Sequence, residues 1–150
     1  MLRRFALTAA VSLAALAAVS GAAFADGPQP VAQVPTRQAP DRLTVTVTNS
    51  GVRTAEGTYQ LQCGPDGATG THRSPQEACD RLAALAADGK QPFAPVPKGL
   101  MCTMQYGGPA TAHITGTWHG QPVDATFRRT NGCEISRWNN LVPVLPHAAP

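Results

Sequence analysis

The sequence predicts an α+β domain in which an antiparallel sheet carries a helix on one face. Three observations lead to this prediction. Short segments that alternate apolar and polar residues are separated by turn residues, which is typical of antiparallel strands. One segment has clear start and stop signals for a helix. Four cysteines in a chain of 150 residues indicate that disulfides hold the domain together.

The first 25 residues are predicted to be an export signal and not part of the fold. Arg3 and Arg4 precede an apolar stretch over residues 5–19, and the small-x-small pattern of residues 23–25 suits signal cleavage. A membrane anchor is the alternative, but an anchor needs about 20 apolar residues, and polar residues interrupt this stretch. We therefore expect a secreted chain that begins near Asp26 and is not attached to a membrane.

The segment after the signal is predicted to be a flexible arm at residues 26–41, because four prolines lie among small and polar residues. We place the folded domain at residues 42–150. Its first strand is expected at once, since residues 42–48 alternate Leu or Val with Thr. A turn and a second alternating segment at residues 58–63 then continue a meander.

The clearest helix signal follows a predicted loop at residues 64–73. Ser74 suits the N-cap, Pro75 suits the first helical position, and Glu77 completes a capping box. Gly89 can end the helix. An apolar stripe at helical spacing is formed by Ala78, Leu82 and Leu85.

Three prolines mark residues 90–100 as an exposed connector. Strand-like segments resume after it, at residues 101–106, 110–118 and 122–129. A hairpin turn at His119-Gly120 joins the last two. We expect Trp118 and Phe127 to build the core and to contribute to a dimer face. Prolines limit the tail, residues 138–150, to an edge or irregular strand.

The charge and residue pattern argue against several classes of function. Two of the 12 Lys and Arg residues fall in the predicted signal and all 9 Asp and Glu residues follow it, so the exported part is nearly neutral. Without a basic patch, nucleic-acid binding is not expected. No close carboxylate pair or nucleophile turn marks an active site, so we do not expect an enzyme.

All four cysteines lie in the exported part, and their even number in a small secreted chain indicates a disulfide framework. Three connectivities are possible in principle. Metal binding is not indicated, because there is no Cys-x-x-Cys pair and the four histidines are dispersed. We expect no cofactor.

Residues 101–109, Met-Cys-Thr-Met-Gln-Tyr-Gly-Gly-Pro, carry the most informative pattern. Cys102 lies two positions before Met104 in a stretch bounded by Gly and Pro, as is typical of a surface loop. An exposed Met between polar neighbours suits the specificity pocket of a protease. Taken alone, however, a Met in a short strand more often belongs to the core.

Several separate motifs together resemble the subtilisin inhibitors of Streptomyces, over essentially the whole exported chain. All four cysteines fall where that family places them. The motifs are the strand 43–47, Cys63-Gly64-Pro65 with Gly70-Thr71-His72, residues 78–84, residues 101–106, residues 116–120, and Phe127 with residues 131–134. The combination is specific enough to favour an exposed Met104.

The resemblance implies a five-stranded antiparallel sheet with two helices, the disulfides Cys63–Cys79 and Cys102–Cys133, and a homodimer formed sheet to sheet. It also implies a secreted inhibitor of subtilisin-like serine proteases, with chymotrypsin-like enzymes as further targets. The protein would bind its protease as a substrate does and release it slowly.

The resemblance further implies that the scissile bond is Met104–Gln105 and that Met104 enters the primary specificity pocket. Asn131, beside the second disulfide, would brace the loop from behind. The flanking positions would be Cys102 and Thr103 on the acyl side, and Gln105 and Tyr106 on the leaving side.

Two departures from the family pattern affect this loop. Thr103 stands where the family often has Pro, so we expect less preorganisation. Gly107-Gly108 before Pro109 adds one residue to the usual Asp-Pro, so we expect a longer and looser far side. Two alternatives remain open: a secreted β-rich binding module that has lost inhibition, and an inhibitor whose natural target is a metalloprotease.

Overall fold

The computed structural model describes residues 39–149. The predicted export signal and most of the predicted arm lie outside the described residues. The described strands are β1 (Asp41–Thr48), β2 (Gly57–Gly64), β3 (Gly67–Gly70), β4 (Thr111–Trp118) and β5 (Gln121–Phe127), and the helices are α1 (Pro75–Ala87), α2 (Gly132–Asn140) and the short 3-10 turn η1 (Arg53–Ala55). None of the helices in this range is long and apolar enough to cross a membrane.

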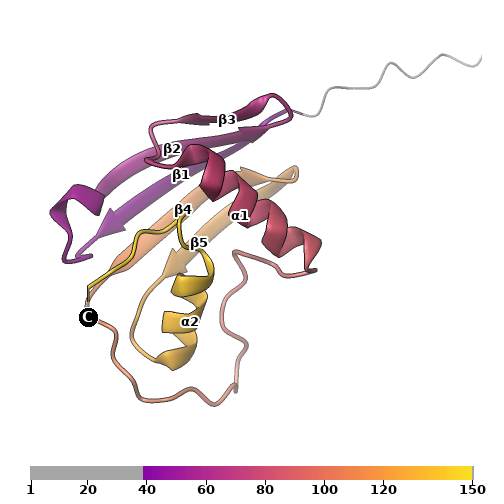
Figure 1. The fold of residues 1–150 in the computed structure, drawn as a ribbon. Coiled ribbons are helices and arrows are strands. Elements are labelled where there is room, and N and C mark those ends of the chain that lie inside the picture. The colour runs from indigo at the N-terminus through magenta and orange to yellow at the C-terminus, as the bar shows by residue number, and fades with distance from the viewer. Residues whose placement is uncertain (1–38, 150) are drawn as a thin grey trace, which may run out of the picture. The chain divides into compact units, whose positions relative to one another are not determined.

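The strands form one five-stranded antiparallel sheet, as predicted, in the order β3-β2-β1-β4-β5. The first strand of the domain is thus the central one. Val45 of β1 lies opposite Tyr59 of β2 on one side and opposite Ile114 of β4 on the other. Figure 1 shows both α-helices on the same face of this sheet, so the domain has two layers.

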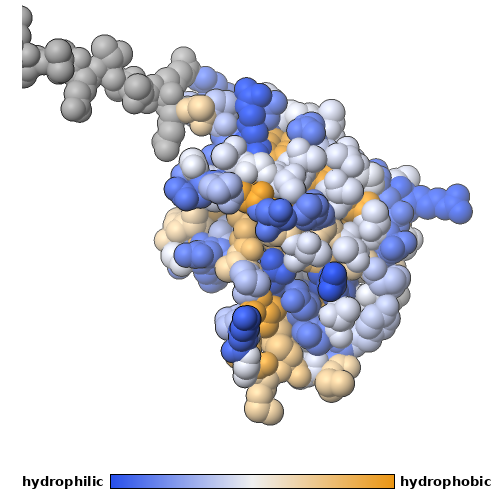
Figure 2. Space-filling model, turned by 180° about the vertical axis from the view of Figure 1, so that it is seen from behind, coloured by the Kyte–Doolittle hydropathy of each residue, from blue (hydrophilic) through white to orange (hydrophobic). Residues whose placement is uncertain are grey.

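The alternation predicted for β1 separates a buried face from a polar face. Leu43, Val45 and Val47 are at most 1% exposed and lie in the core with Phe127, while Trp118 is 9% exposed at its edge. The threonines between them point to the other face, where Thr46 and Thr58 share a hydrogen bond of 3.1 Å between their hydroxyls. Figure 2 shows this uncovered side as mostly polar.

Helix α1 begins and ends as predicted, but the predicted capping box is wrong. The hydroxyl of Ser74 makes no capping hydrogen bond. The backbone of Ser74 is held differently, because its N–H donates to Nδ1 of His72 at 3.2 Å. At the other end, Gly89 adopts a φ of 69° and its N–H donates to the carbonyl of Ala86, which closes the helix.

Two predictions for irregular segments are also wrong. The predicted loop 64–73 contains β3, an edge strand that pairs with β2 through its backbone and buries little side-chain area, so the sequence carries no alternation to predict it. The strand-like segment 101–106 forms no strand; it is an exposed, irregular loop.

The C-terminal segment differs from the predicted edge or irregular strand. Helix α2 continues to Asn140, and the chain then turns back across the core. Leu141, Val144 and Leu145 are at most 1% exposed, and the indole N–H of Trp138 donates to the carbonyl of Pro146 at 2.9 Å. The prolines thus shape a buried return segment and not a strand.

We predict that Trp138→Phe destabilises the domain more than the same change at Trp118. Trp138 is fully buried and its loss leaves the Pro146 carbonyl without a donor, so the free energy of unfolding should fall by about 2 to 4 kcal/mol. Trp118 lies at the edge of the core, and Trp118→Phe should cost below about 1.5 kcal/mol. Urea unfolding followed by circular dichroism measures both; equal losses would contradict this ranking.

Candidate functional site

The loop 101–106 joins the connector 90–100 to the segment that leads into β4, and its side chains are largely exposed. Met104 is 97% exposed, Met101 95% and Tyr106 65%, although all three are large. The loop lies at the lower end of Figure 1, away from the sheet and α1. Apolar atoms gather at the same end in Figure 2, which makes this the apolar tip of a mostly polar surface.

The first half of this loop, residues 102 and 103, is fixed to the start of α2 by two contacts. The disulfide Cys102–Cys133 joins them with a Cα–Cα distance of 5.4 Å. The N–H of Gly132 donates to the carbonyl of Thr103 at 3.0 Å. Gly132 has no room for a side chain, because a Cβ there would overlap Oγ1 of Thr103. A larger residue at position 132 would therefore force the side chain of Thr103 to move.

The other side of the loop is fixed to Arg129 by a reciprocal pair of hydrogen bonds. The N–H of Gly107 donates to the carbonyl of Arg129 at 2.8 Å, and Nε of Arg129 donates to the carbonyl of Gly107 at 2.7 Å. The guanidinium is held in turn by the side-chain oxygen of Asn139 at 3.0 Å. Gly107 and Gly108 are both buried. Gly107 is thus held to the chain that leaves β5, and the looseness expected from the two glycines stays a prediction.

Asn131 stands next to these contacts, and its side chain caps α2. Its Oδ1 accepts a hydrogen bond from the N–H of Glu134 at 2.9 Å, which is the usual role of Asn at an N-cap. The hydrogen bond to the loop comes from the following residue, Gly132. Asn131 thus supports the helix start from which the loop is held.

The second disulfide implied by the resemblance, Cys63–Cys79, is also present in the structure. It joins β2 to the first turn of α1 with a Cα–Cα distance of 5.6 Å. Both cysteines pack with the core or against it, so this disulfide connects a helix to the sheet. Residues 39–149 contain no cluster of His, Cys, Asp or Glu that could hold a metal ion.

Three residues at this site were not identified from the sequence. Met101 is as exposed as Met104, while Gly132 and Arg129 contact the two sides of the loop. Nothing in the sequence marks Gly132, because its contact with Thr103 depends on how the folded loop meets α2. Nothing in the sequence marks Arg129 either, because its role depends on where β5 ends relative to the loop.

The family model for subtilisin inhibitor-like proteins matches residues 39–131. The chain belongs to the subtilisin inhibitor-like family. Kexstatin-1 of Streptomyces platensis is 33% identical over 137 residues, which cover 87% of this chain and 92% of that protein. Subtilisin inhibitor-like protein 1 of Streptomyces cacaoi is 32% identical over 106 residues, which cover 66% of this chain and 90% of that protein.

A solved structure of Streptomyces caespitosus sermetstatin in complex with Bacillus licheniformis subtilisin is 25% identical and has a TM-score of 0.43, covering 70% of this chain and 99% of that chain. Members of the subtilisin inhibitor-like family are protease inhibitors. The chain is therefore a protease inhibitor and not an enzyme, and the resemblance drawn from its motifs is confirmed.

Proposed function

We propose that the chain inhibits extracellular subtilisin-like serine proteases through the loop 101–106, with Met104–Gln105 as the scissile bond. The observation that carries this proposal is the combination of a fully exposed Met104 with a loop that is fixed on both sides. An exposed apolar side chain on a rigid loop is unfavourable in water, and it is accounted for when a partner's pocket covers it.

Met104 suits the broad apolar pockets of subtilisin-like and chymotrypsin-like enzymes. Its side chain is unbranched and uncharged, so it adapts to the shape of a pocket without leaving a buried charge unpaired. Leu100 and Met101 are 56% and 95% exposed and extend the apolar surface upstream. These exposed apolar side chains can thus fill more than one pocket along a substrate-binding cleft.

Inhibition follows from what happens after the bond is cut. The new carboxyl end at Met104 stays with Thr103, which Gly132 and the Cys102–Cys133 disulfide hold. The new amino end at Gln105 stays near Gly107, which Arg129 holds. Groups held in this way reach effective molarities of about 10⁵ M or more, so the bond is resealed faster than water removes the acyl group.

Binding also benefits from this rigidity. An ordinary peptide loses conformational freedom when it enters a protease cleft, and this loss weakens its affinity. A loop that is already held on both sides avoids part of the loss. A binding module without inhibition would leave this geometry without a use and would fail to block subtilisin in titration. A metalloprotease target is separated by titrating the chain against a metalloprotease beside subtilisin.

We further propose that residues 1–25 direct export, that residues 26–41 form an arm and that residues 42–150 form the inhibitor domain. The motive is the charge, apolar and small-residue pattern of the first 25 residues. Mass spectrometry of the protein from culture medium should give a chain that begins at Asp26. A cell-bound chain that keeps residues 1–25 would contradict the export proposal.

We also propose a homodimer formed through the uncovered face of the sheet. Three half-buried threonines, Thr44, Thr46 and Thr115, lie on this face, and the larger His113 beside them is paired with Asp124 at 2.8 Å, so the face offers few unpaired charges to a second copy. Trp118 and Phe127 are buried and are no longer candidates for this contact. Sedimentation at micromolar concentration should give twice the mass of the secreted chain, and a monomer at this concentration would contradict it.

We predict that Met104→Lys changes specificity toward trypsin. In a trypsin pocket, Met104 leaves a buried carboxylate without a cationic partner, so the Lys variant should bind trypsin about 100- to 1,000-fold more tightly. Subtilisin, with its more permissive pocket, should be affected less. Inhibition constants for both enzymes measure this, and N-terminal sequencing of the cut chain should give Gln105. An unchanged constant for trypsin, or a cut elsewhere, would contradict the assignment of Met104.

We predict that Gly132→Ala weakens inhibition without destabilising the fold. Ala is preferred over Gly in a helix by about 1 kcal/mol, so thermal stability should not fall. The added Cβ displaces Thr103, however, and the rate of loop cleavage by subtilisin should rise by about tenfold or more. Thr103→Ala removes the overlapping Oγ1, so the double variant should return toward the rate of Thr103→Ala alone. If subtilisin cleaves the loop of Gly132→Ala at the wild-type rate, this contact is not important for inhibition.

A further inference from the structure

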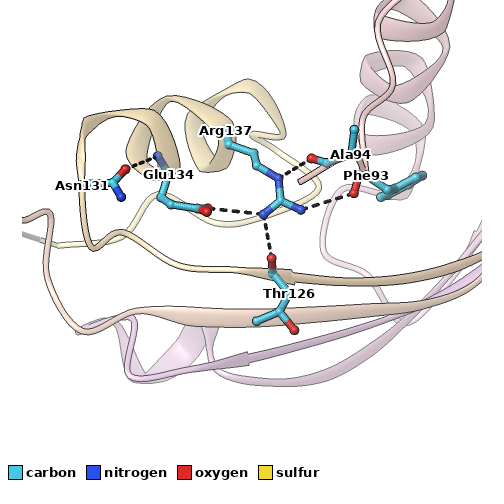
Figure 3. Close-up of polar contacts among 6 residues, drawn as sticks. All are labelled: Phe93, Ala94, Thr126, Asn131, Glu134 and Arg137. Atoms are coloured by element: carbon cyan, nitrogen blue, oxygen red, sulfur yellow. Dashed lines mark hydrogen bonds and ion pairs between the residues drawn. The ribbon is translucent and has the colours of Figure 1, made fainter. Parts of the chain in front are cut away.

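Arg137 of α2 binds backbone carbonyls of two other segments (Figure 3). Its Nε donates to the carbonyl of Ala94 at 2.7 Å, and its terminal nitrogens donate to the carbonyl of Phe93 at 3.3 Å and to that of Thr126 at 2.7 Å. Phe93 and Ala94 belong to the connector 90–100, and Thr126 belongs to β5. A single side chain thus joins the connector, the sheet and the helix.

The guanidinium of Arg137 is held in a fixed orientation. It lies 3.9 Å from the centroid of the Phe127 ring, and it forms an ion pair of 3.3 Å with Glu134. Its side chain is only 12% exposed. Because the guanidinium is planar and its donors point in fixed directions, these contacts define the place of the connector more strictly than a flexible ammonium group would.

The connector has few other points of attachment near the loop. Phe93 packs edge-on against Trp118, with ring centroids 6.3 Å apart. Beyond Ala94, a groove of about 600 Å³ separates the connector from α2. The next covalent attachment of the connector to α2 is the Cys102–Cys133 disulfide, and beside it the carbonyl of Thr103 accepts a hydrogen bond from the N–H of Gly132. The contacts at residues 93–94 and at residues 102–103 therefore set the course of the segment between them.

Both attachments come from one face of the same helix. Cys133 and Arg137 are four residues apart in α2, a spacing that places side chains one above the other. The Cys102–Cys133 disulfide by itself would let the connector rotate about the single bonds of the two cysteine side chains. A second contact one helical turn away fixes the direction from which the connector enters the acyl side of the loop.

We propose that Arg137 is a positioning residue for inhibition: by holding Phe93 and Ala94, it keeps the acyl side of the loop 101–106 in the orientation that allows resealing. This inference rests on the proposed function of that loop. Arg137 touches neither the scissile bond nor the protease in this account. Its effect reaches the loop through the connector.

The test measures the protein as a substrate of subtilisin. With catalytic amounts of enzyme, Arg137→Met should raise kcat for cleavage of Met104–Gln105 by about 10- to 100-fold, the loss expected when reacting groups are displaced by about 1 Å. KM should change much less, since the residues that contact the enzyme are unchanged. Arg137→Lys keeps the charge and the alkyl stem but places its N–H donors on a single nitrogen, which cannot reach all three carbonyls, so its kcat should lie between those of Arg137→Met and the wild type.

Arg81→Met is the matched control. Nε of Arg81 donates to the carbonyl of Asn140 at 2.7 Å, so this change also removes an arginine-to-backbone contact at α2, but without touching the connector. Its kcat should equal that of the wild type even where thermal unfolding shows a similar loss of stability. If Arg137→Met does not fold, Arg137→Lys carries the comparison.

Two outcomes overturn the inference while the proposed function stands: wild-type kcat in the folded Arg137 variants, or the same rise in kcat for Arg81→Met. A wild-type chain that neither inhibits subtilisin nor is cut at Met104–Gln105 is a different failure. It overturns the proposed function, and this inference with it.

Discussion

The segment 129–133, which runs from the end of β5 into the start of α2, holds both sides of one exposed loop, and the proposed inhibition depends on this constraint. Residues 129–133 provide a reciprocal hydrogen-bond pair to Gly107, a backbone hydrogen bond to Thr103 and a disulfide to Cys102. The two sides of the Met104–Gln105 bond are thus attached to one short stretch of chain. If that stretch is rigid, cutting the bond changes the covalent structure but hardly changes the positions of the two new ends.

The rest of the domain keeps residues 129–133 rigid. This segment connects β5 to α2, and both elements pack on the core, where Phe127 and Trp138 are fully buried. The Cys102–Cys133 disulfide closes a sequence separation of 31 residues and Cys63–Cys79 closes one of 16. In the chain-entropy model each contributes roughly 3 to 4 kcal/mol to stability. A domain of this size buries a limited apolar surface, so its stability benefits from both disulfides.

Elements with a strong local pattern could be predicted from the sequence, and those defined by partners could not. The alternation of β1, the apolar stripe of α1 and the turn at His119-Gly120, where both residues adopt positive φ, follow from local rules. The edge strand β3 and the return segment after Asn140 depend on neighbours that only the folded chain supplies. At the site, Met104 and the cysteines were identified through the family resemblance. Arg129 and Arg137 act on distant backbone carbonyls, which no local pattern reveals.

The most direct test of the account removes the disulfide beside the loop. In the variant Cys102→Ser with Cys133→Ser, the Cys63–Cys79 disulfide still connects α1 to the sheet, so circular dichroism should show a folded domain. Incubated with catalytic subtilisin, this variant should be cut completely and lose its inhibition with time, while the wild type stays largely intact and inhibitory. A folded double variant that inhibits as durably as the wild type would contradict the account, because resealing would then not depend on the disulfide that holds the Met104 end at the start of α2.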